Sequence, residues 1–255
     1  MRRIDFNSDM GESFGTYRLG LDEEVIKYIT SANIACGFHA GDPACMRRTV
    51  RLAEEHGVGV GAHPGFPDLR GFGRRNLAAT PEEVRDDVVY QIGALTPFTT
   101  ARKLQHVKPH GALYNMAVVD PKLARAICEA VLEADPDLIL VLLAGSGWAE
   151  MADEMGLKVA REAFADRALN ADGTLVPRSK PGSVLHDVDE VVERSLRLVT
   201  EGTVKAVTGE TVPVRADTIC LHGDNPAAVK LAAALRGAFE NAGVQLVPMG
   251  RARSD

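Results

Sequence analysis

The chain has 255 residues, 45% of them hydrophobic and 25% charged, which is enough apolar material for one large core. Its 29 basic residues stand against 35 acidic ones, giving a net charge of −6, and no lysine- or arginine-rich run interrupts the mixed pattern. The composition therefore argues against nucleic acid as a partner.

Short apolar or β-branched runs alternate with longer amphipathic stretches along the whole chain, a pattern typical of βα units. Seven or eight such units in a chain of this length predict an α/β fold with a closed (β/α) barrel rather than an open doubly wound sheet. With no linker, repeat or low-complexity tract, we expect residues 1–255 to form a single domain. The expected strands are Ile4–Asp9, Ala32–Cys36, Gly57–Ala62, Gln105–Lys108, Leu138–Ala144, Lys158–Phe164, Thr218–Leu221 and Val244–Val247.

Helix starts are predicted where a capping side chain precedes a first-turn proline, at Thr80-Pro81 and at Asp224-Asn225-Pro226. Two segments interrupt the alternation. Residues 170–182 contain two turn signals and are expected to be irregular, whereas residues 204–214 predict a hairpin.

The first residues, MRRIDFNSDMGES, do not resemble a signal peptide, and no apolar run approaches the ~20 residues of a membrane span. The four cysteines, at positions 36, 45, 128 and 220, show no CxxC spacing. We therefore expect a cytoplasmic protein with reduced thiols and no membrane partner. Cys36, which follows an apolar run, is interpreted as a packed thiol.

Nearly every cluster of ionisable residues follows a predicted strand, where barrels build their active sites. In the first strand Asp5, Asn7 and Asp9 are spaced by two, so their side chains share one face. We expect Asp5, deepest in the strand, to bond its neighbours in a structural role. For Asp9 and Glu12, at the strand exit, a functional role is favoured.

Four of the seven histidines follow strands close to glycine or proline, where a ligand can approach the backbone. Because they follow four separate strands, we predict that His39, His63, His110 and His222 share one site. The other three, His56, His106 and His186, are explained by their places at the ends of predicted helices and strands, and no chemistry is assigned to them.

The segment Asp68–Arg75 is a glycine-rich loop that carries guanidinium groups back over the exit of the third strand. Arg70 and Arg74 are predicted to clamp an anion there, the alternative being a solvated surface loop. Arg178, in the irregular segment, is a weaker candidate of the same kind.

Carboxylates and histidines at strand ends would also suit zinc or a 2-His-1-carboxylate site. However, HExxH is absent, and the one HxxxH spacing, His106 to His110, passes through Pro109 at a strand end. A divalent metal is therefore left as an open alternative. No GxGxxG or GxxxxGK[ST] motif follows a strand, so the usual nucleotide-binding loops are missing.

Read together, several motifs closely resemble the LamB/YcsF family, in order and over nearly the whole chain. They are DFNSDMGESFG (5–15), SANIACGFHAGDP (31–43), GAHPGFPDLRGFGRR (61–75), VKPHGALYN (107–115), REAFADR (161–167), GTLVPRS (173–179) and CLHGD (220–224). Ser13 stands where glycine is expected and Leu169 where an aromatic is usual. These departures affect loop detail rather than the resemblance.

The resemblance implies a distorted (β/α) TIM-like barrel of seven or so parallel strands, related to carbohydrate deacetylase barrels. It also implies one subunit of a prokaryotic ATP-dependent 5-oxoprolinase that works with partner subunits B and C. Such an enzyme opens the lactam of 5-oxoproline to glutamate, with ATP as co-substrate. The expected route is phosphorylation of the lactam oxygen, attack by an activated water and loss of phosphate as the ring opens.

That chemistry needs cations, a base and an acid, and the residues fall into three groups of expected roles. Base and acid are sought among Asp9, Glu12, His39, His63 and His110. Substrate or phosphate binding is expected from Asn7, Asn33, Arg70, Arg74, Lys108, Arg167 and Arg178. Supporting roles, including orientation of the histidines, are expected from Asp42, Glu162, Asp166, His222 and Asp224.

Two other functions fit the same residues. One is a stand-alone metal-dependent hydrolase or deacetylase acting on an amide or a sugar. The other is a non-catalytic subunit that holds the lactam while partner subunits perform the chemistry.

Overall fold

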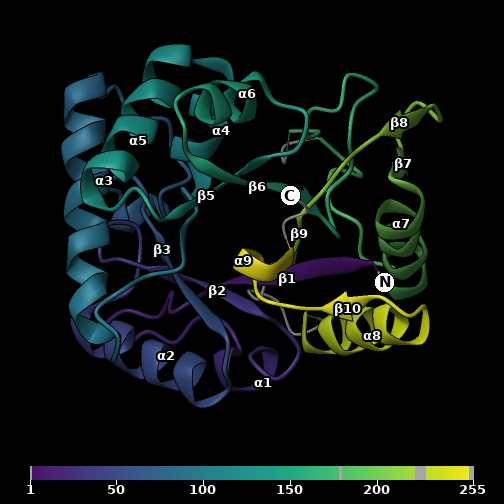
Figure 1. Cartoon of the computed structure of the whole chain (residues 1–255), viewed down its shortest axis with the longest axis horizontal. Helices are drawn as coiled ribbons and strands as arrows, with labels where there is room; N and C mark the ends of the chain where they lie inside the picture. The colour runs from purple at the N-terminus through teal and green to yellow at the C-terminus, as the bar shows by residue number, and fades with distance from the viewer. Residues whose placement is uncertain (1, 178–179, 222–227, 253–255) are drawn as a thin grey trace.

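A ring of parallel strands forms the centre of the computed structural model, which describes residues 2–177, 180–221 and 228–252 (Figure 1). The strands pair in chain order, and the last returns to the first to close the barrel. The ring consists of β1 (Arg3–Met10), β2 (Ser31–Ala35), β3 (Gly59–His63), β4 (His106–Val107), β5 (Ile139–Leu143), β6 (Lys158–Phe164) and β9 (Thr218–Leu221).

The ring confirms the predicted (β/α) barrel of seven or so parallel strands. It is distorted because β1 pairs with two strands along one edge: its first residues, Arg3 and Ile4, pair with β10 (Gln245–Leu246), and its later residues pair with β9. The eight predicted strands all occur, within about two residues at each end. The predicted hairpin is also present, as the antiparallel pair β7 (Thr203–Lys205) and β8 (Thr211–Pro213).

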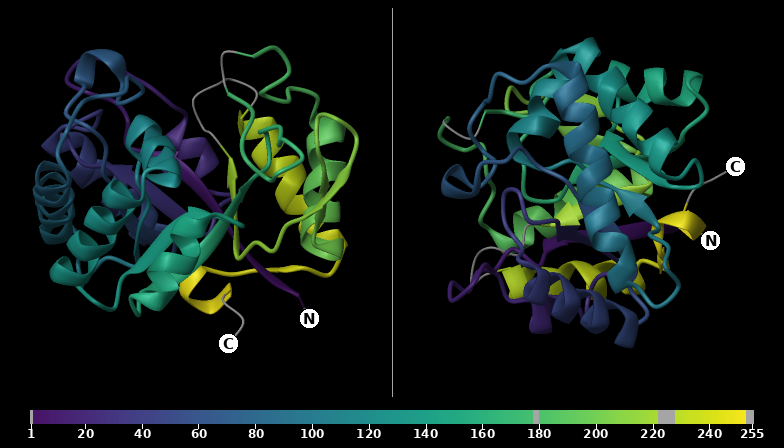
Figure 2. Two further views of the ribbon diagram at one scale, coloured as in Figure 1. Left: turned by 90° about the horizontal axis from the view of Figure 1, so that it is seen from above. Right: turned by 90° about the vertical axis from the view of Figure 1, so that its left-hand side faces the viewer.

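Helices surround the ring on its outer side in all three views (Figure 1 and Figure 2). Thr80 caps α3 with a full capping box and Pro81 opens it, as predicted, whereas the expected start at Asp224-Asn225-Pro226 lies outside the described residues. None of the described helices is both long and apolar enough to cross a bilayer. The helices are α1 (Asp22–Val25), α2 (Pro43–Glu55), α3 (Pro81–Leu95), α4 (Gly111–Val119), α5 (Pro121–Ala134), α6 (Gly147–Glu154), α7 (Val188–Glu201), α8 (Ala228–Asn241) and α9 (Met249–Ala252).

Alternation along β1 separates an apolar outer face from a polar inner one. Phe6 is fully buried against Phe239 of α8, with the ring centroids 6.2 Å apart. Asp5 and Asn7 are also fully buried, on the face toward the barrel interior. The interior near β1 is therefore polar, unlike the Val, Ile and Leu layers that usually fill such barrels.

The barrel interior on the side opposite β1 is apolar, and the amino ends of the strands are covered there. Ile139 and Val141 of β5, together with Ala160 of β6, form a small core cluster with Met249 of α9. Because α9 also packs against the start of β1, it covers the amino ends of the strands. The accessible end of the barrel is the carboxyl end, where polar residues from β1, β3, β4 and β6 or the segments that follow them gather.

Candidate active site at the barrel mouth

A cavity of about 700 Å³ opens at the carboxyl ends of the strands. One wall is ionisable and the other is apolar, the latter built mainly by α4, β6 and the segment 174–177. A pocket of this size and mixed character is typical of small-molecule sites, which span ~300–1,000 Å³. The ionisable and polar lining residues are Asp9, Glu12, His63, Arg74, Asn76, Lys108, His110, Tyr114, Asn115, Arg167 and Thr174.

The buried cation Lys108 organises the floor of the cavity. Its Nζ lies 3.0 Å from Asp9 Oδ1 and 2.8 Å from Glu162 Oε1, and it donates to Cys220 Sγ at 3.0 Å. Burial opposes the charge on Lys108, but Asp9, Cys220 and Glu162 together raise its pKa well above the usual value. Lys108 is thus a permanent cation. It holds two carboxylates of the protein in place, so its charge is not directed at a ligand alone.

Glu162 is fully buried below Lys108 and accepts from the hydroxyl of Tyr114 at 3.2 Å and from Asn7 Nδ2 at 3.3 Å. The expectation that Glu162 orients a histidine is replaced by a role as counter-ion of Lys108. Tyr114 of α4 was not singled out from the sequence, although it stands in the motif VKPHGALYN. Burial and the nearby Glu162 raise its pKa well above the usual value, so it stays a hydrogen-bond donor.

A second polar layer links β1, β2 and β4. Asn33 Nδ2 donates to Asn7 Oδ1 at 2.8 Å and to Asp9 Oδ1 at 2.9 Å. His106 Nε2 lies 2.7 Å from Asn33 Oδ1, and burial lowers the pKa of His106 to about 3. A neutral His106 therefore donates to Asn33, so His106, to which no chemistry was assigned, belongs to the support of the site. Asn7 and Asn33 lie beneath the cavity and do not line it.

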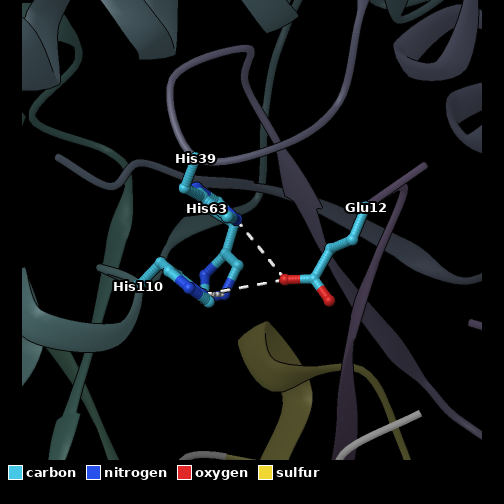
Figure 3. A group of neighbouring side chains, drawn as sticks. All are labelled: Glu12, His39, His63 and His110. Carbon is cyan, nitrogen blue, oxygen red and sulfur yellow. Dashed lines mark hydrogen bonds and ion pairs between the residues drawn. The ribbon is translucent and has the colours of Figure 1, made fainter. Parts of the chain in front are cut away.

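Three of the four predicted histidines converge above this layer with Glu12 (Figure 3). His39 and His110 stack with ring centroids 3.7 Å apart and an interplanar angle of 4°, and His63 meets His110 edge-on at 4.8 Å. Glu12 Oε1 lies 3.4 Å from His39 Nε2 and 3.7 Å from His110 Nδ1. The fourth predicted histidine, His222, lies outside the described residues, as do Arg178 and Asp224.

Backbone carbonyls fix the orientation of two of these rings. His63 Nδ1 lies 2.6 Å from the carbonyl oxygen of Lys108, and His110 Nε2 lies 2.8 Å from that of Phe72. Since a carbonyl oxygen can only accept, both of these nitrogens carry hydrogen. The other nitrogens, His63 Nε2 and His110 Nδ1, face each other at 3.0 Å, and His63 Nε2 also lies 3.3 Å from Asp9 Oδ2.

His39 and His110 are buried, which disfavours their charged forms. Burial, and next the neighbouring His63, lower the pKa of His110 to about 3. Burial and then His110 and His63 lower the pKa of His39 well below its usual value.

Glycines allow the rings to pack this closely. A Cβ at Gly65 would lie 2.7 Å from His39 Nδ1, and one at Gly73 would lie 2.7 Å from His39 Cβ and 2.9 Å from His110 Cδ2. Gly65 is held in turn by the buried side chain of Gln91, which accepts from its N–H at 3.0 Å and donates to its carbonyl at 2.9 Å. Gln91 was missed because it lies mid-helix in α3, where only its burial distinguishes it.

The arginine loop contributes one of its predicted cations to the cavity. Arg74 lines the cavity, with its guanidinium carbon 5.0 Å from the ring centroid of Phe72. Arg70 lies exposed on the short turn Leu69–Gly71 and does not line the cavity, so its expected role as an anion clamp is not supported. Arg75, which was not predicted, pairs with buried Asp68 and fixes the loop.

Two further predicted residues serve local structure. The carboxylate of Asp42 accepts from the backbone N–H groups of Ala44 and Cys45 at the start of α2, and from that of Gly15. It therefore caps a helix and does not orient a histidine. Arg167 lines the cavity, but its guanidinium donates to the carbonyls of Val176 and Ser183, at 2.7 and 3.2 Å, which ties the irregular segment to the barrel.

The remaining predictions concern Asp166 and Cys36. Asp166 is buried at the exit of β6, close enough to Arg194 of α7 for their charges to interact. Cys36 is buried, and burial raises the pKa of its thiol to about 12, so it is a packed thiol as predicted.

The fold and the site define a (β/α)-barrel protein with carboxylates and histidines gathered where barrel enzymes hold their catalytic groups. The chain belongs to the LamB/YcsF family, whose model matches residues 4–254. The protein named as the A subunit of 5-oxoprolinase in Thermococcus onnurineus is 62% identical over 97% of this chain and 98% of its own length. The protein of the same name from Pyrococcus horikoshii is 60% identical, with the same coverage.

Solved structures agree with this assignment. A lactam utilization protein from Thermus thermophilus superposes with a TM-score of 0.92 at 52% identity, covering 96% of this chain and 99% of that one. The T48 deacetylase superposes with a TM-score of 0.51 at 16% identity, covering 98% of this chain and 90% of that one. The second likeness concerns the fold alone.

Proposed function

We propose that this chain is the A subunit of an ATP-dependent 5-oxoprolinase, which opens 5-oxo-L-proline to L-glutamate as ATP is hydrolysed to ADP and phosphate. The observation that carries the proposal is the 62% identity, over nearly the full length of both chains, to a protein named as the A subunit of 5-oxoprolinase. The word subunit in the name of that relative also motivates the proposal that the chain works with partner subunits B and C. A cytoplasmic location is proposed because the four cysteines are free thiols.

The cavity offers groups suited to a small cyclic amide that carries a carboxylate. Arg74, at the rim, is the proposed partner of the substrate carboxylate. The apolar wall, which includes Leu143, Phe164 and Val176, suits the methylene groups of the ring. Asp9 and Glu12 lie on the ionisable wall, next to the expected position of the amide.

In the proposed reaction the lactam oxygen attacks the γ-phosphorus of ATP and ADP leaves, since an unactivated amide is a poor electrophile. Water then adds to the activated carbon, the carbon–nitrogen bond breaks and the ring nitrogen takes up a proton. The resulting acyl phosphate reacts with a second water to give glutamate and inorganic phosphate. The reaction consumes two waters and needs a base and an acid at the ring.

Asp9 is the proposed base. Its Oδ1 is held by Lys108 and Asn33, while its Oδ2 points toward the histidines and the residue lines the cavity. Lys108 and Asn33 fix Oδ1 of this carboxylate, which leaves Oδ2 as the proposed acceptor of a proton from water. The proton that Asp9 takes from the water is the proposed source of the proton for the ring nitrogen.

The direct test is glutamate release from 5-oxoproline with ATP, measured for this protein alone, for subunits B and C alone, and for the mixture. We expect glutamate only from the mixture, with one ADP formed per glutamate. Glutamate from subunits B and C without this chain would contradict the proposal and favour a substrate-holding subunit. No glutamate from a mixture whose partners are active with an A subunit of another source would favour the hydrolase or deacetylase function.

A further inference from the structure

The site contains a compact set of potential metal ligands drawn from four separate segments. Glu12 follows β1, His39 lies in the turn after β2, His63 ends β3 and His110 is the residue directly before α4. One ligand atom from each residue lies within 4.8 Å of the other three. Figure 3 shows the three rings and the carboxylate directed toward one another.

The hydrogen-bonding pattern of His63 and His110 requires a positive species between them. Each ring uses its N–H on a backbone carbonyl, at 2.6 Å for His63 and 2.8 Å for His110. When both rings are neutral, the remaining nitrogens present lone pairs to each other at only 3.0 Å. Two such lone pairs repel unless a proton or a metal ion lies between or beside them.

His39 provides a second, independent observation. It is 1% exposed, and among the described residues neither of its ring nitrogens has a hydrogen-bond partner. Its Nε2 lies 3.4 Å from Glu12 Oε1, on the side where His63 and His110 direct their remaining nitrogens. A buried imidazole without hydrogen bonds is costly, and an ion held by its Nε2 would remove that cost at one of its two nitrogens.

Three of the distances between ligand atoms are close to the spacing found in tetrahedral coordination. Metal–nitrogen bonds of about 2.0–2.1 Å place the ligands of a tetrahedral zinc ion about 3.3 Å apart. The distances here are 3.0 Å from His63 Nε2 to His110 Nδ1, 3.4 Å from His39 Nε2 to Glu12 Oε1, and 3.7 Å from His110 Nδ1 to Glu12 Oε1. Rotations of the side chains that tilt the stacked rings of His39 and His110 toward each other would bring all four onto one ion.

We propose that Glu12, His39, His63 and His110 bind one divalent transition-metal ion of the zinc class. Three imidazoles with one carboxylate suit Zn²⁺, Co²⁺ or Ni²⁺, whereas Mg²⁺ and Ca²⁺ prefer oxygen ligands. Glu12, His63 and His110 line the cavity, so the ion would be accessible to a bound substrate. The inference concerns binding alone and stands independently of the proposed 5-oxoprolinase activity.

The backbone contacts act as the outer support that such a site needs. The carbonyls of Lys108 and Phe72 select the ring nitrogen that faces the ion, and Asp9 Oδ2 lies 3.3 Å from His63 Nε2. Ligating histidines in proteins typically have their second nitrogen bonded in this way.

The test is metal uptake by the full chain after removal of metals with a chelator. Titration with Zn²⁺, followed by calorimetry, should show one tight site per chain, and elemental analysis should show the same stoichiometry after gel filtration. We expect Glu12→Gln and His39→Gln each to weaken Zn²⁺ binding by at least about 100-fold. The matched control is His56→Gln, an exposed histidine at the end of α2, which should bind Zn²⁺ as the unaltered chain does.

A second measurement covers variants that fail to fold. Co²⁺ added to the unaltered chain should give the intense visible bands of tetrahedral coordination without a thiolate charge-transfer band. A thiolate band would place the ion at a cysteine and overturn the proposal, as would unchanged affinity in both folded variants. Absence of Zn²⁺ and Co²⁺ uptake, with a proton shared by His63 and His110 in ¹⁵N NMR spectra, would equally overturn it.

Discussion

Each end of the polar barrel interior contains an aspartate of β1, but the two aspartates have different kinds of partner. At the closed end Asp5 accepts from the hydroxyls of Thr30, Ser31 and Thr218, with oxygen–oxygen distances of 2.8, 2.5 and 2.5 Å. At the mouth, four residues further along β1, Asp9 faces a lysine, a histidine and the cavity. Position along one strand thus separates a structural carboxylate from a candidate catalytic one.

The partners explain the difference. The hydroxyl groups around Asp5 are neutral donors without access to solvent, so the closed end is satisfied internally. At the mouth the donors of His63 and His110 are used on backbone carbonyls, which leaves their reactive nitrogens directed at carboxylates. The mouth is therefore arranged for an external proton, ion or substrate.

The largest expected effect is on catalysis, from Asp9→Asn. Loss of a general base lowers rates by ~10²–10⁴, so we expect kcat of the reconstituted mixture to fall in that range with a smaller change in KM. Glutamate release measures both constants. Asp5→Asn is the matched control at the closed end, and its kcat should change far less. Equal losses in the two variants would contradict the assigned difference between the ends.

The next effect is on stability, from Lys108→Met. This change leaves the buried carboxylate of Glu162 and the partly buried one of Asp9 without their cation, and losses of this kind cost ~3–5 kcal/mol. Urea unfolding of the purified chain measures the change. Lys158→Met is the control, because Lys158 pairs with Asp137 on the exposed surface, where an ion pair contributes at most ~1 kcal/mol. A loss no larger than the control's would show that Lys108 does not balance the two carboxylates.

The pH dependence of stability tests the closed end. Burial raises the pKa of Asp5 to about 6 from 3.8, although the hydroxyl donors oppose this change. Between these values the folded chain binds more protons than the unfolded chain, so this contribution to stability is present at low pH and is lost as pH rises to about 6. The loss amounts to at most about 3 kcal/mol. Asp5→Asn should remove this slope.

Free energies of unfolding of the unaltered chain and of Asp5→Asn, measured from pH 4 to pH 7, would reveal this difference in slope. The two curves should approach each other in shape above about pH 6, where Asp5 is ionised in both states. Parallel curves throughout would show that Asp5 has no raised pKa.

Much of the barrel could be predicted from the sequence because its strands are continuous apolar runs bounded by polar exits. The spacing of Asp5, Asn7 and Asp9 likewise indicated the polar face of β1. The contacts of His106 with Asn33, and of Glu162 with Lys108, could not be predicted. They depend on the register between strands distant in sequence, which sequence periodicity does not encode.

The expected role of Asp42 is wrong for a different reason, because the neighbouring sequence already indicated that this residue caps a helix. Asp42-Pro43 repeats the combination of a capping side chain and a first-turn proline that correctly predicted the start of α3 at Thr80-Pro81. The proximity of Asp42 to His39 in sequence favoured a catalytic interpretation, whereas the local capping signal had the stronger physical basis.

The smallest effect concerns the glycine that lies against the histidines. Gly73 has φ of +62°, and a Cβ there would lie 2.7 Å from His39 Cβ. Gly57, at the end of α2, has nearly the same φ of +67° but no atom within 4 Å of the added Cβ among the described residues. Alanine at either position incurs the strain of a left-handed backbone, about 1 kcal/mol, but only alanine at Gly73 must also displace a ring.

We therefore expect Gly73→Ala to lower the free energy of unfolding by about 1–3 kcal/mol more than Gly57→Ala does, the usual cost of overpacking. Urea unfolding of the two variants isolates that difference because the backbone strain cancels. Gly73→Ala should also lower kcat, since displacement of His39 or His110 disturbs the cluster at the mouth, whereas Gly57→Ala should not. Equal stability losses with unchanged kcat would mean that the histidines tolerate displacement, and the mouth would then be less rigid than the closed end.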